Sequence, residues 1–198
     1  MMMQKRCVFL DRDGVLVKDV GLLTRAEDIH VYKDVPLALN RLKENGFRLI
    51  VVSNQTVVAR GLMSETEMLS LNQQVNKAII KAGGPKPDVF YYCPHHPNAT
   101  LEAYRLECEC RKPNPGLILQ AAIEHNIDLY TSFFVGDRIT DIIAGQRAGC
   151  RTILVQTGEH NVPPIQTSAS IDLSIQPDYT CRSFEEATKW ILMADIRQ

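Results

Sequence analysis

Residues 7–16 read CVFLDRDGVL, in which four apolar residues run directly into Asp11, Arg12, Asp13 and Gly14. The apolar run predicts a buried strand, and the alternation of side chains along a strand points Asp11 and Asp13 in roughly the same direction. Two carboxylates this close repel each other unless a cation offsets their charge. The motif therefore predicts a cation site at a strand end, with an acidic helix N-terminus as the alternative interpretation.

Outward from this motif, short apolar runs alternate with helical patterns along the chain. Strands are predicted at Cys7–Leu10, Phe47–Val52, Val89–Tyr92, Ser132–Val135 and Arg151–Val155, with an edge strand at Pro177–Tyr179. Helices are predicted at Pro36–Asn45, from a capping box at Ser64–Glu67 to Ala82, from an Asn114 cap to His125, at Ile139–Ala148 and at Ser183–Met193. The polar segment Thr157–Ser174 is predicted to be a loop. This alternation predicts an α/β fold with a doubly wound, Rossmann-like parallel sheet.

Polar residues follow two further predicted strands, at the end of the sheet where such folds bind ligands. Ser53 and Asn54 can donate hydrogen bonds to an anion, although this pair alone also suits an ordinary turn. Gly136-Asp137 ends a later strand, and Asp141 lies one helical turn further on, either near a metal or as a helix cap. Two or three converging carboxylates select a hard cation, Mg²⁺ above all.

Arg111 and Lys112 precede a predicted helix, where a lysine charge could hold a phosphate. Alone, this pair also suits a solvated surface. Beside the acidic residues and Ser53, however, it predicts a site for phosphoryl transfer.

A cysteine-rich segment lies just before this basic pair. Cys93 and His95 are followed, after twelve residues, by Cys108 and Cys110. Three thiols and one imidazole form a common ligand set for structural zinc. The alternatives are three reduced surface thiols, or His96 in place of His95. Cys7, Cys150 and Cys181 lie in strand-like or junction contexts and are predicted to be buried, small apolar residues.

The composition is that of a water-soluble globular protein. The 198 residues carry 22 Lys and Arg against 23 Asp and Glu, a net charge of −1, which argues against a nucleic-acid partner. Neither a membrane span nor a signal peptide is predicted, so we expect a cytoplasmic protein with reduced thiols. One domain over residues 1–198, with a zinc loop at about 93–110 and no cap domain, is expected, as is a monomer.

These motifs together resemble the haloacid dehalogenase superfamily of phosphohydrolases. The four matching motifs are Asp11-x-Asp13-Gly14, Ser53, Lys112, and Gly136-Asp137 with Asp141. A closer resemblance is to the D-glycero-D-manno-heptose 1,7-bisphosphate 7-phosphatases, and the histidinol-phosphate phosphatases are similar in the same places. It rests on Asp11-Arg-Asp-Gly, Ser53-Asn-Gln, Ala59-Arg-Gly61, Tyr92-Cys-Pro-His-His-Pro97, Cys108-x-Cys-Arg-Lys-Pro113 and Gly136-Asp137.

The resemblance implies a role for most of these residues. Asp11 would attack phosphorus, and Asp13 would serve as general acid and then general base. Mg²⁺ would be held by the Asp11 carboxylate, the Asp13 backbone carbonyl and Asp137. The remaining roles would be phosphoryl binding by Ser53 and Lys112, substrate contacts from Asn54 and Arg111, support from Asp141, and zinc binding by Cys93, His95, Cys108 and Cys110.

The implied activity is Mg²⁺-dependent removal of the 7-phosphate of a heptose bisphosphate through an aspartyl-phosphate intermediate. It would belong to the ADP- or GDP-heptose pathway that supplies lipopolysaccharide core or another surface glycan. Hydrolysis of histidinol phosphate or another small sugar phosphate is the alternative. A non-enzymatic phospho-receiver domain is a remote one, since receivers place the paired acids and the acceptor Asp on separate strands.

Overall fold

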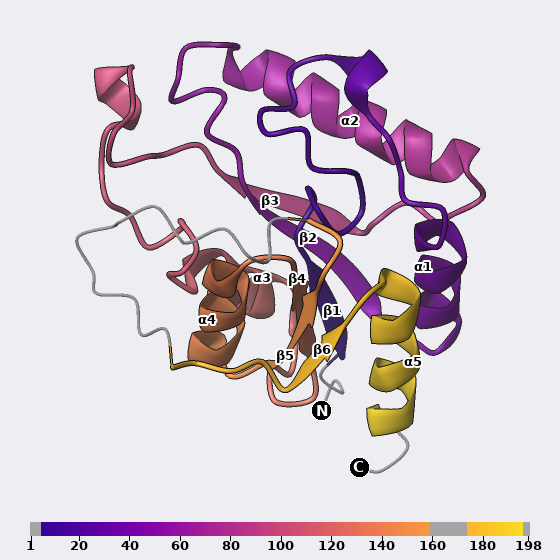
Figure 1. Ribbon diagram of the computed structural model, residues 1–198. Helices are drawn as coiled ribbons and strands as arrows, with labels where there is room; N and C mark the ends of the chain where they lie inside the picture. The colour runs from indigo at the N-terminus through magenta and orange to yellow at the C-terminus, as the bar shows by residue number, and fades with distance from the viewer. Residues whose placement is uncertain (1–4, 159–173, 196–198) are drawn as a thin grey trace.

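A computed structural model describes residues 5–158 and 174–195 of the chain. Six strands form one sheet in the order β3-β2-β1-β4-β5-β6, and every neighbouring pair is parallel (Figure 1). They are β1 (Cys7–Leu10), β2 (Arg48–Asn54), β3 (Val89–Cys93), β4 (Phe133–Gly136), β5 (Arg151–Val155) and β6 (Tyr179–Cys181). The predicted parallel α/β sheet is confirmed.

Helices cover both faces of the sheet. They are α1 (Val35–Glu44), α2 (Glu65–Lys81), α3 (Gly116–His125), α4 (Ile139–Ala148) and α5 (Phe184–Asp195), with short 3₁₀ turns η1 (Ala26–Asp28) and η2 (Glu102–Tyr104). Because side chains alternate along β1, Val8 and Leu10 pack toward α1, α2 and α5, whereas Cys7 and Phe9 pack toward α3 and α4. This double burial explains why the strand is apolar at every position.

One predicted helix start is confirmed, and two other element ends differ from their predicted positions. The capping box of α2 is present, with Ser64 Oγ accepting a hydrogen bond from the Glu67 N–H. The Asn114 cap is wrong: Pro115 precedes α3, and the Asn114 side chain instead donates to the carbonyl of Cys108. β2 continues through Asn54, so Ser53 lies within a strand rather than a turn.

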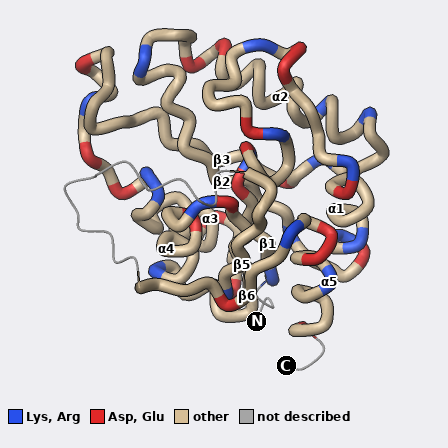
Figure 2. Tube along the Cα trace, viewed as in Figure 1, with Lys and Arg blue, Asp and Glu red and all other residues tan. Residues whose placement is uncertain are grey.

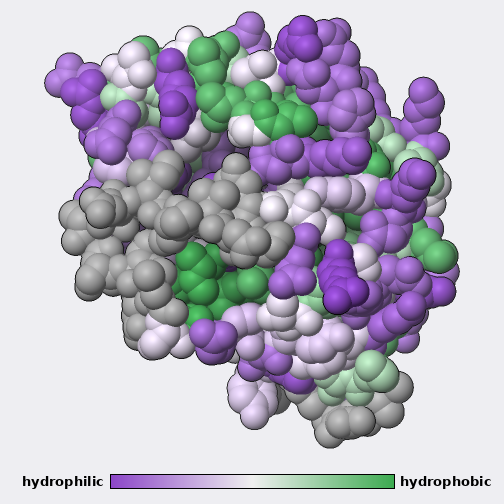
Figure 3. Space-filling model, viewed as in Figure 1, coloured by the Kyte–Doolittle hydropathy of each residue, from purple (hydrophilic) through white to green (hydrophobic). Residues whose placement is uncertain are grey.

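The nearly balanced numbers of acidic and basic residues in the composition are also seen in how these residues are distributed over the structure. Figure 2 shows acidic and basic residues interspersed along the trace rather than gathered on one side. On the face seen in Figure 3, hydrophilic side chains predominate, and a hydrophobic patch lies near the N-terminal end of α2. Within residues 5–158 and 174–195, no helix combines the length and apolar character that crossing a bilayer requires. Most of the loop predicted at Thr157–Ser174 lies outside the described residues.

Candidate active site

The carboxyl ends of β1, β2 and β4 meet at one edge of the sheet. β1 pairs with both of the other strands, and Leu10 at its end is the register partner of Val135 in β4. The N–H of Asp11 extends this ladder by one hydrogen bond of 3.0 Å to the carbonyl of Val135. Asp11 is therefore the first residue after β1. Ser53 of β2 lies on one side of it, and Asp137, which follows β4, lies on the other.

Three carboxylates converge at this edge. Asp11, Asp137 and Asp141 each offer an oxygen, these oxygens lie within 4.8 Å of one another, and all three residues are buried. Asp141 lies in the first turn of α4, where one carboxylate oxygen accepts hydrogen bonds from the backbone N–H groups of Asp137 at 3.2 Å and Arg138 at 3.0 Å. Asp141 therefore caps the helix and also faces the site, which combines the two alternatives that the sequence left open.

Glycine lets the backbone approach Asp137 closely. Gly14 has φ +77°, and a Cβ there would lie 2.2 Å from Oδ2 of Asp137. A Cβ on Gly158 would lie 2.1 Å from the same oxygen. The Asp137 carboxylate is thus packed between two stretches of bare backbone. Because the donors are three buried carboxylates whose charges repel one another, the group fits a hard divalent cation such as Mg²⁺.

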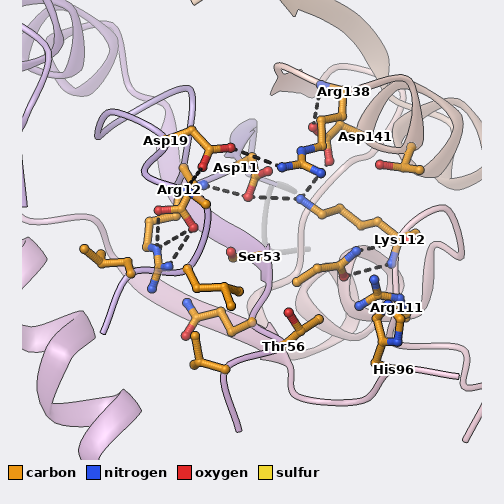
Figure 4. Close-up of a pocket in the computed structure, with 18 of the residues that line it drawn as sticks. Asp11, Arg12, Asp19, Ser53, Thr56, His96, Arg111, Lys112, Arg138 and Asp141 are labelled. Carbon is orange, nitrogen blue, oxygen red and sulfur yellow. Dashed lines mark hydrogen bonds and ion pairs between the residues drawn. The ribbon is translucent and has the colours of Figure 1, made fainter. Parts of the chain in front are cut away.

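Lys112 supplies the positive charge within this acidic cluster (Figure 4). Its ammonium lies 3.1 Å from Oδ1 of Asp11 and 2.8 Å from Oδ1 of Asp141, and it donates to the carbonyl of Val52 at 2.9 Å. Burial favours the neutral amine, but the two carboxylates outweigh burial and raise the pKa of Lys112. The lysine therefore stays charged in a buried position, as binding a phosphoryl group requires.

Asp13 stands apart from the three carboxylates. Its counter-charge is its own neighbour Arg12, whose guanidinium binds the Asp13 carboxylate at 2.6–3.1 Å. Burial raises the pKa of Asp13, and Arg12 opposes that rise. Sequence reasoning missed Arg12; a basic residue between two acidic ones was the signal that could have drawn attention to it.

Asn54 and Arg111 hold the backbone around Lys112. The Asn54 carboxamide donates to the carbonyl of Lys112 and accepts from its N–H, both at 3.1 Å. Arg111 donates to the carbonyl of His95 at 3.0 Å. These hydrogen bonds fix the path of the chain. Both residues also line the same cleft as Asp11, and their substrate contacts remain predictions.

The cleft above the carboxylates has a volume of about 300 Å³. Two basic residues that the sequence did not assign to the site, Arg60 and Arg138, also line it. Arg138 is paired with Asp19, with 3.1 Å between guanidinium and carboxylate. A cleft with acidic residues at its base and basic residues on its walls suits a phosphorylated ligand of small size.

The cysteine-rich segment also forms a cluster. One ligand atom each from Cys93, His95, Cys108 and Cys110 lies within 4.8 Å of the others, and sulfur–sulfur distances are 3.0–3.5 Å. His96 is not a member; its ring accepts a hydrogen bond from the N–H of Asn98. The close contact with neighbouring thiols and with His95 lowers the pKa of Cys110 to about 5. A Cys₃His donor set of this compactness fits Zn²⁺.

The other three cysteines are buried, as predicted. Cys7, Cys150 and Cys181 are free thiols that lie in the two hydrophobic clusters of the core. Burial raises the pKa of Cys150 to about 12 and that of Cys181 to about 11, so both stay protonated.

Comparison with known proteins gives consistent matches. A family model described as HAD-hydrolase-like matches residues 109–187. The chain is 40% identical over 163 residues to the D-glycero-β-D-manno-heptose-1,7-bisphosphate 7-phosphatase of Photorhabdus laumondii, covering 82% of this chain and 84% of that protein. It is 36% identical over 164 residues to the corresponding α-anomer phosphatase of the same organism, covering 82% and 89%. The solved D,D-heptose 1,7-bisphosphate phosphatase of B. bronchiseptica, complexed with magnesium and phosphate, matches with a TM-score of 0.77 at 25% identity, covering 96% of this chain and 99% of that one.

Proposed function

The chain belongs to the haloacid dehalogenase-like hydrolases, in the family of the D-glycero-D-manno-heptose-1,7-bisphosphate 7-phosphatases, and from this premise we propose that it removes the 7-phosphate of that sugar bisphosphate. One observation carries the proposal: Asp11, Asp137, Asp141 and Lys112 converge at the ends of β1 and β4. A phosphomonoester hydrolase needs a nucleophile, a cation site and a buried positive charge in one place, and in this proposal the group would supply all three.

The proposed reaction runs in two steps on Asp11. In the first, an Asp11 carboxylate oxygen attacks phosphorus, the bond between phosphorus and the sugar oxygen breaks, and Asp13 gives a proton to that oxygen. In the second, water attacks the aspartyl phosphate while Asp13 accepts a proton from it. The second step releases inorganic phosphate and restores the Asp11 carboxylate.

The remaining residues would bind and orient the phosphoryl group. Lys112 and Ser53 would contact its oxygens, while Asp141 holds the Lys112 ammonium in place. Mg²⁺, when bound by the Asp11 carboxylate, the Asp13 carbonyl and Asp137, would offset the repulsion between the nucleophile and the phosphate.

A second phosphate on the substrate would find its counter-charge in the arginines of the cleft wall. Arg111 has the forked donors that bind phosphate in a bidentate manner, and Asn54 lies beside it in the cleft.

Zn²⁺ would have a structural role. Held by Cys93, His95, Cys108 and Cys110, it would fix a loop that has little regular structure. Arg111 and Lys112 directly follow Cys110, so the same metal would fix the backbone from which both side chains reach the cleft.

The proposed setting follows from the chemistry. The product retains its 1-phosphate, which is the group that nucleotide transfer to an ADP- or GDP-heptose uses. Reduced thiols for zinc binding favour the cytoplasm. We also propose that the protein is a monomer.

Phosphate release from three candidate substrates tests the function. With Mg²⁺, kcat/KM should be highest for heptose 1,7-bisphosphate and lower for histidinol phosphate and fructose 1,6-bisphosphate, and ³¹P NMR should show that the heptose 1-phosphate remains. Asp11→Asn is the control and should show no turnover. A preference for histidinol phosphate would overturn the proposed substrate, and activity of Asp11→Asn would overturn the assignment of Asp11 as the nucleophile.

A further inference from the structure

Arg12 lies between the two acidic residues of the first motif, and its guanidinium is buried, with 4% of the side chain exposed. Three hydrogen bonds run from it to Asp13: Nε lies 3.1 Å from each carboxylate oxygen, and Nη2 lies 2.6 Å from Oδ2. The third nitrogen, Nη1, points to α2 and donates to Oδ1 of Asn72 at 2.9 Å. Arg12 thus connects Asp13 to a helix on the far side of the guanidinium.

Asn72 is itself held in one orientation. It is 4% exposed, and its carboxamide exchanges two hydrogen bonds with that of Gln55, at 3.0 and 3.3 Å. Gln55 directly follows β2, and its N–H donates to the carbonyl of Cys93 at 2.8 Å. Because Arg12, Asn72 and Gln55 are all buried and have fixed partners, the guanidinium has one favourable position.

We infer that Arg12, held by Asn72, is a positioning residue that fixes the carboxylate of Asp13 for proton transfer to the leaving group. This inference rests on the proposed function, which gives Asp13 the role of general acid and base. Of the three hydrogen bonds from Arg12, two go to Oδ2 and one to Oδ1. Oδ1 therefore keeps a free lone pair and is the atom assigned to carry the proton.

Two features favour orientation over stabilisation as the purpose of this contact. Arg12 and Asp13 are neighbours in the sequence, so their ion pair joins no distant parts of the fold. The Asp13 side chain is also 22% exposed and lines the cleft, so the contact fixes a group that faces the substrate. A general acid held in place contributes about 10²–10⁴-fold to a rate, and losing only its orientation forfeits part of that.

The leaving group distinguishes positioning from structure. A sugar alkoxide needs the proton that Asp13 supplies when its bond to phosphorus breaks, whereas p-nitrophenolate leaves as a stable anion without one. In rapid-mixing experiments, the first turnover of p-nitrophenyl phosphate releases nitrophenolate as Asp11 becomes phosphorylated. The amplitude of that burst also counts the active sites that are correctly folded.

Asn72→Ala removes the support of Arg12 without touching Asp13. Its kcat for heptose 1,7-bisphosphate should fall about 10- to 100-fold with KM within about twofold, while the nitrophenolate burst keeps its rate and amplitude. Arg12→Lys, which cannot reach Asp13 and Asn72 together, should likewise lower kcat for the sugar bisphosphate and leave the nitrophenolate burst unchanged. Asn76→Ala is the matched control on α2, because among the described residues the buried Asn76 carboxamide oxygen has no hydrogen-bond partner.

Two results would overturn the inference. One is an equal loss of the sugar reaction and of the burst in Asn72→Ala; the other is an unchanged kcat for the sugar bisphosphate. Failure of the proposed function would look different: wild-type protein would not release phosphate from the sugar, or Asp11→Asn would retain the burst.

Discussion

Replacing Lys112 by methionine should destabilise the protein by about 3–5 kcal/mol, the range for removing one partner of a buried ion pair. The lysine side chain is 2% exposed, and its partners Asp11 and Asp141 are 10% and 1% exposed. Methionine fills a similar volume, so the cost comes from leaving two carboxylates without the ammonium that lies 3.1 and 2.8 Å away. Urea unfolding in Mg²⁺-free buffer without chelator measures this cost while zinc is retained.

A double-mutant cycle with Asp141→Asn separates the charge effect from packing. The asparagine side chain keeps an oxygen for the backbone N–H groups at the start of α4, but it carries no charge into the site. The double variant should therefore be more stable than the sum of the single costs predicts, by about 1–3 kcal/mol. A cost below about 1 kcal/mol for Lys112→Met, or additivity within about 0.5 kcal/mol, would refute the reasoning.

Three further predictions concern other parts of the structure. Protein purified under reducing conditions without chelator should contain one zinc ion per chain by mass spectrometry, and Cys110→Ser should lower that ratio; wild-type protein without zinc would contradict the site. Gly14→Ala should weaken Mg²⁺ binding about 10-fold or more in calorimetry, because a Cβ there would lie 2.2 Å from Asp137 Oδ2; unchanged affinity would count against the cation site. Burial raises the pKa of Asp88, but a backbone N–H of β2 and the Lys43 ammonium outweigh burial and hold it below the usual 3.8. Asp88→Asn should therefore cost about 1 kcal/mol at neutral pH, and this difference should disappear as the pH falls through the lowered pKa; a difference independent of pH would show that the charge contributes nothing.

Much of the fold and the site could be predicted because local patterns determine them. Strands buried on both faces are continuously apolar, and the ends of parallel strands meet at one edge, so Asp11 and Asp137 could be placed together. Distant partners could not be predicted. Asn114 suits a helix cap, but the carbonyl of Cys108 in the cysteine loop offers it a tertiary partner. The role of Arg12 was hidden because its partner Asn72 lies 60 positions away.

The position of β1 in the sheet has a consequence for synthesis of the chain. Of the six described strands, β1 leaves the ribosome first, yet it lies between β2 and β4. Val8 pairs with Leu49 on one side and with Phe133 on the other, 125 positions later. Until β4 has been made, the nascent chain therefore carries an apolar strand with one open hydrogen-bonding edge, a surface on which unfinished chains can associate. The same order delays the chemistry, because Asp11 meets its partner Asp141 only after 130 further residues have been made.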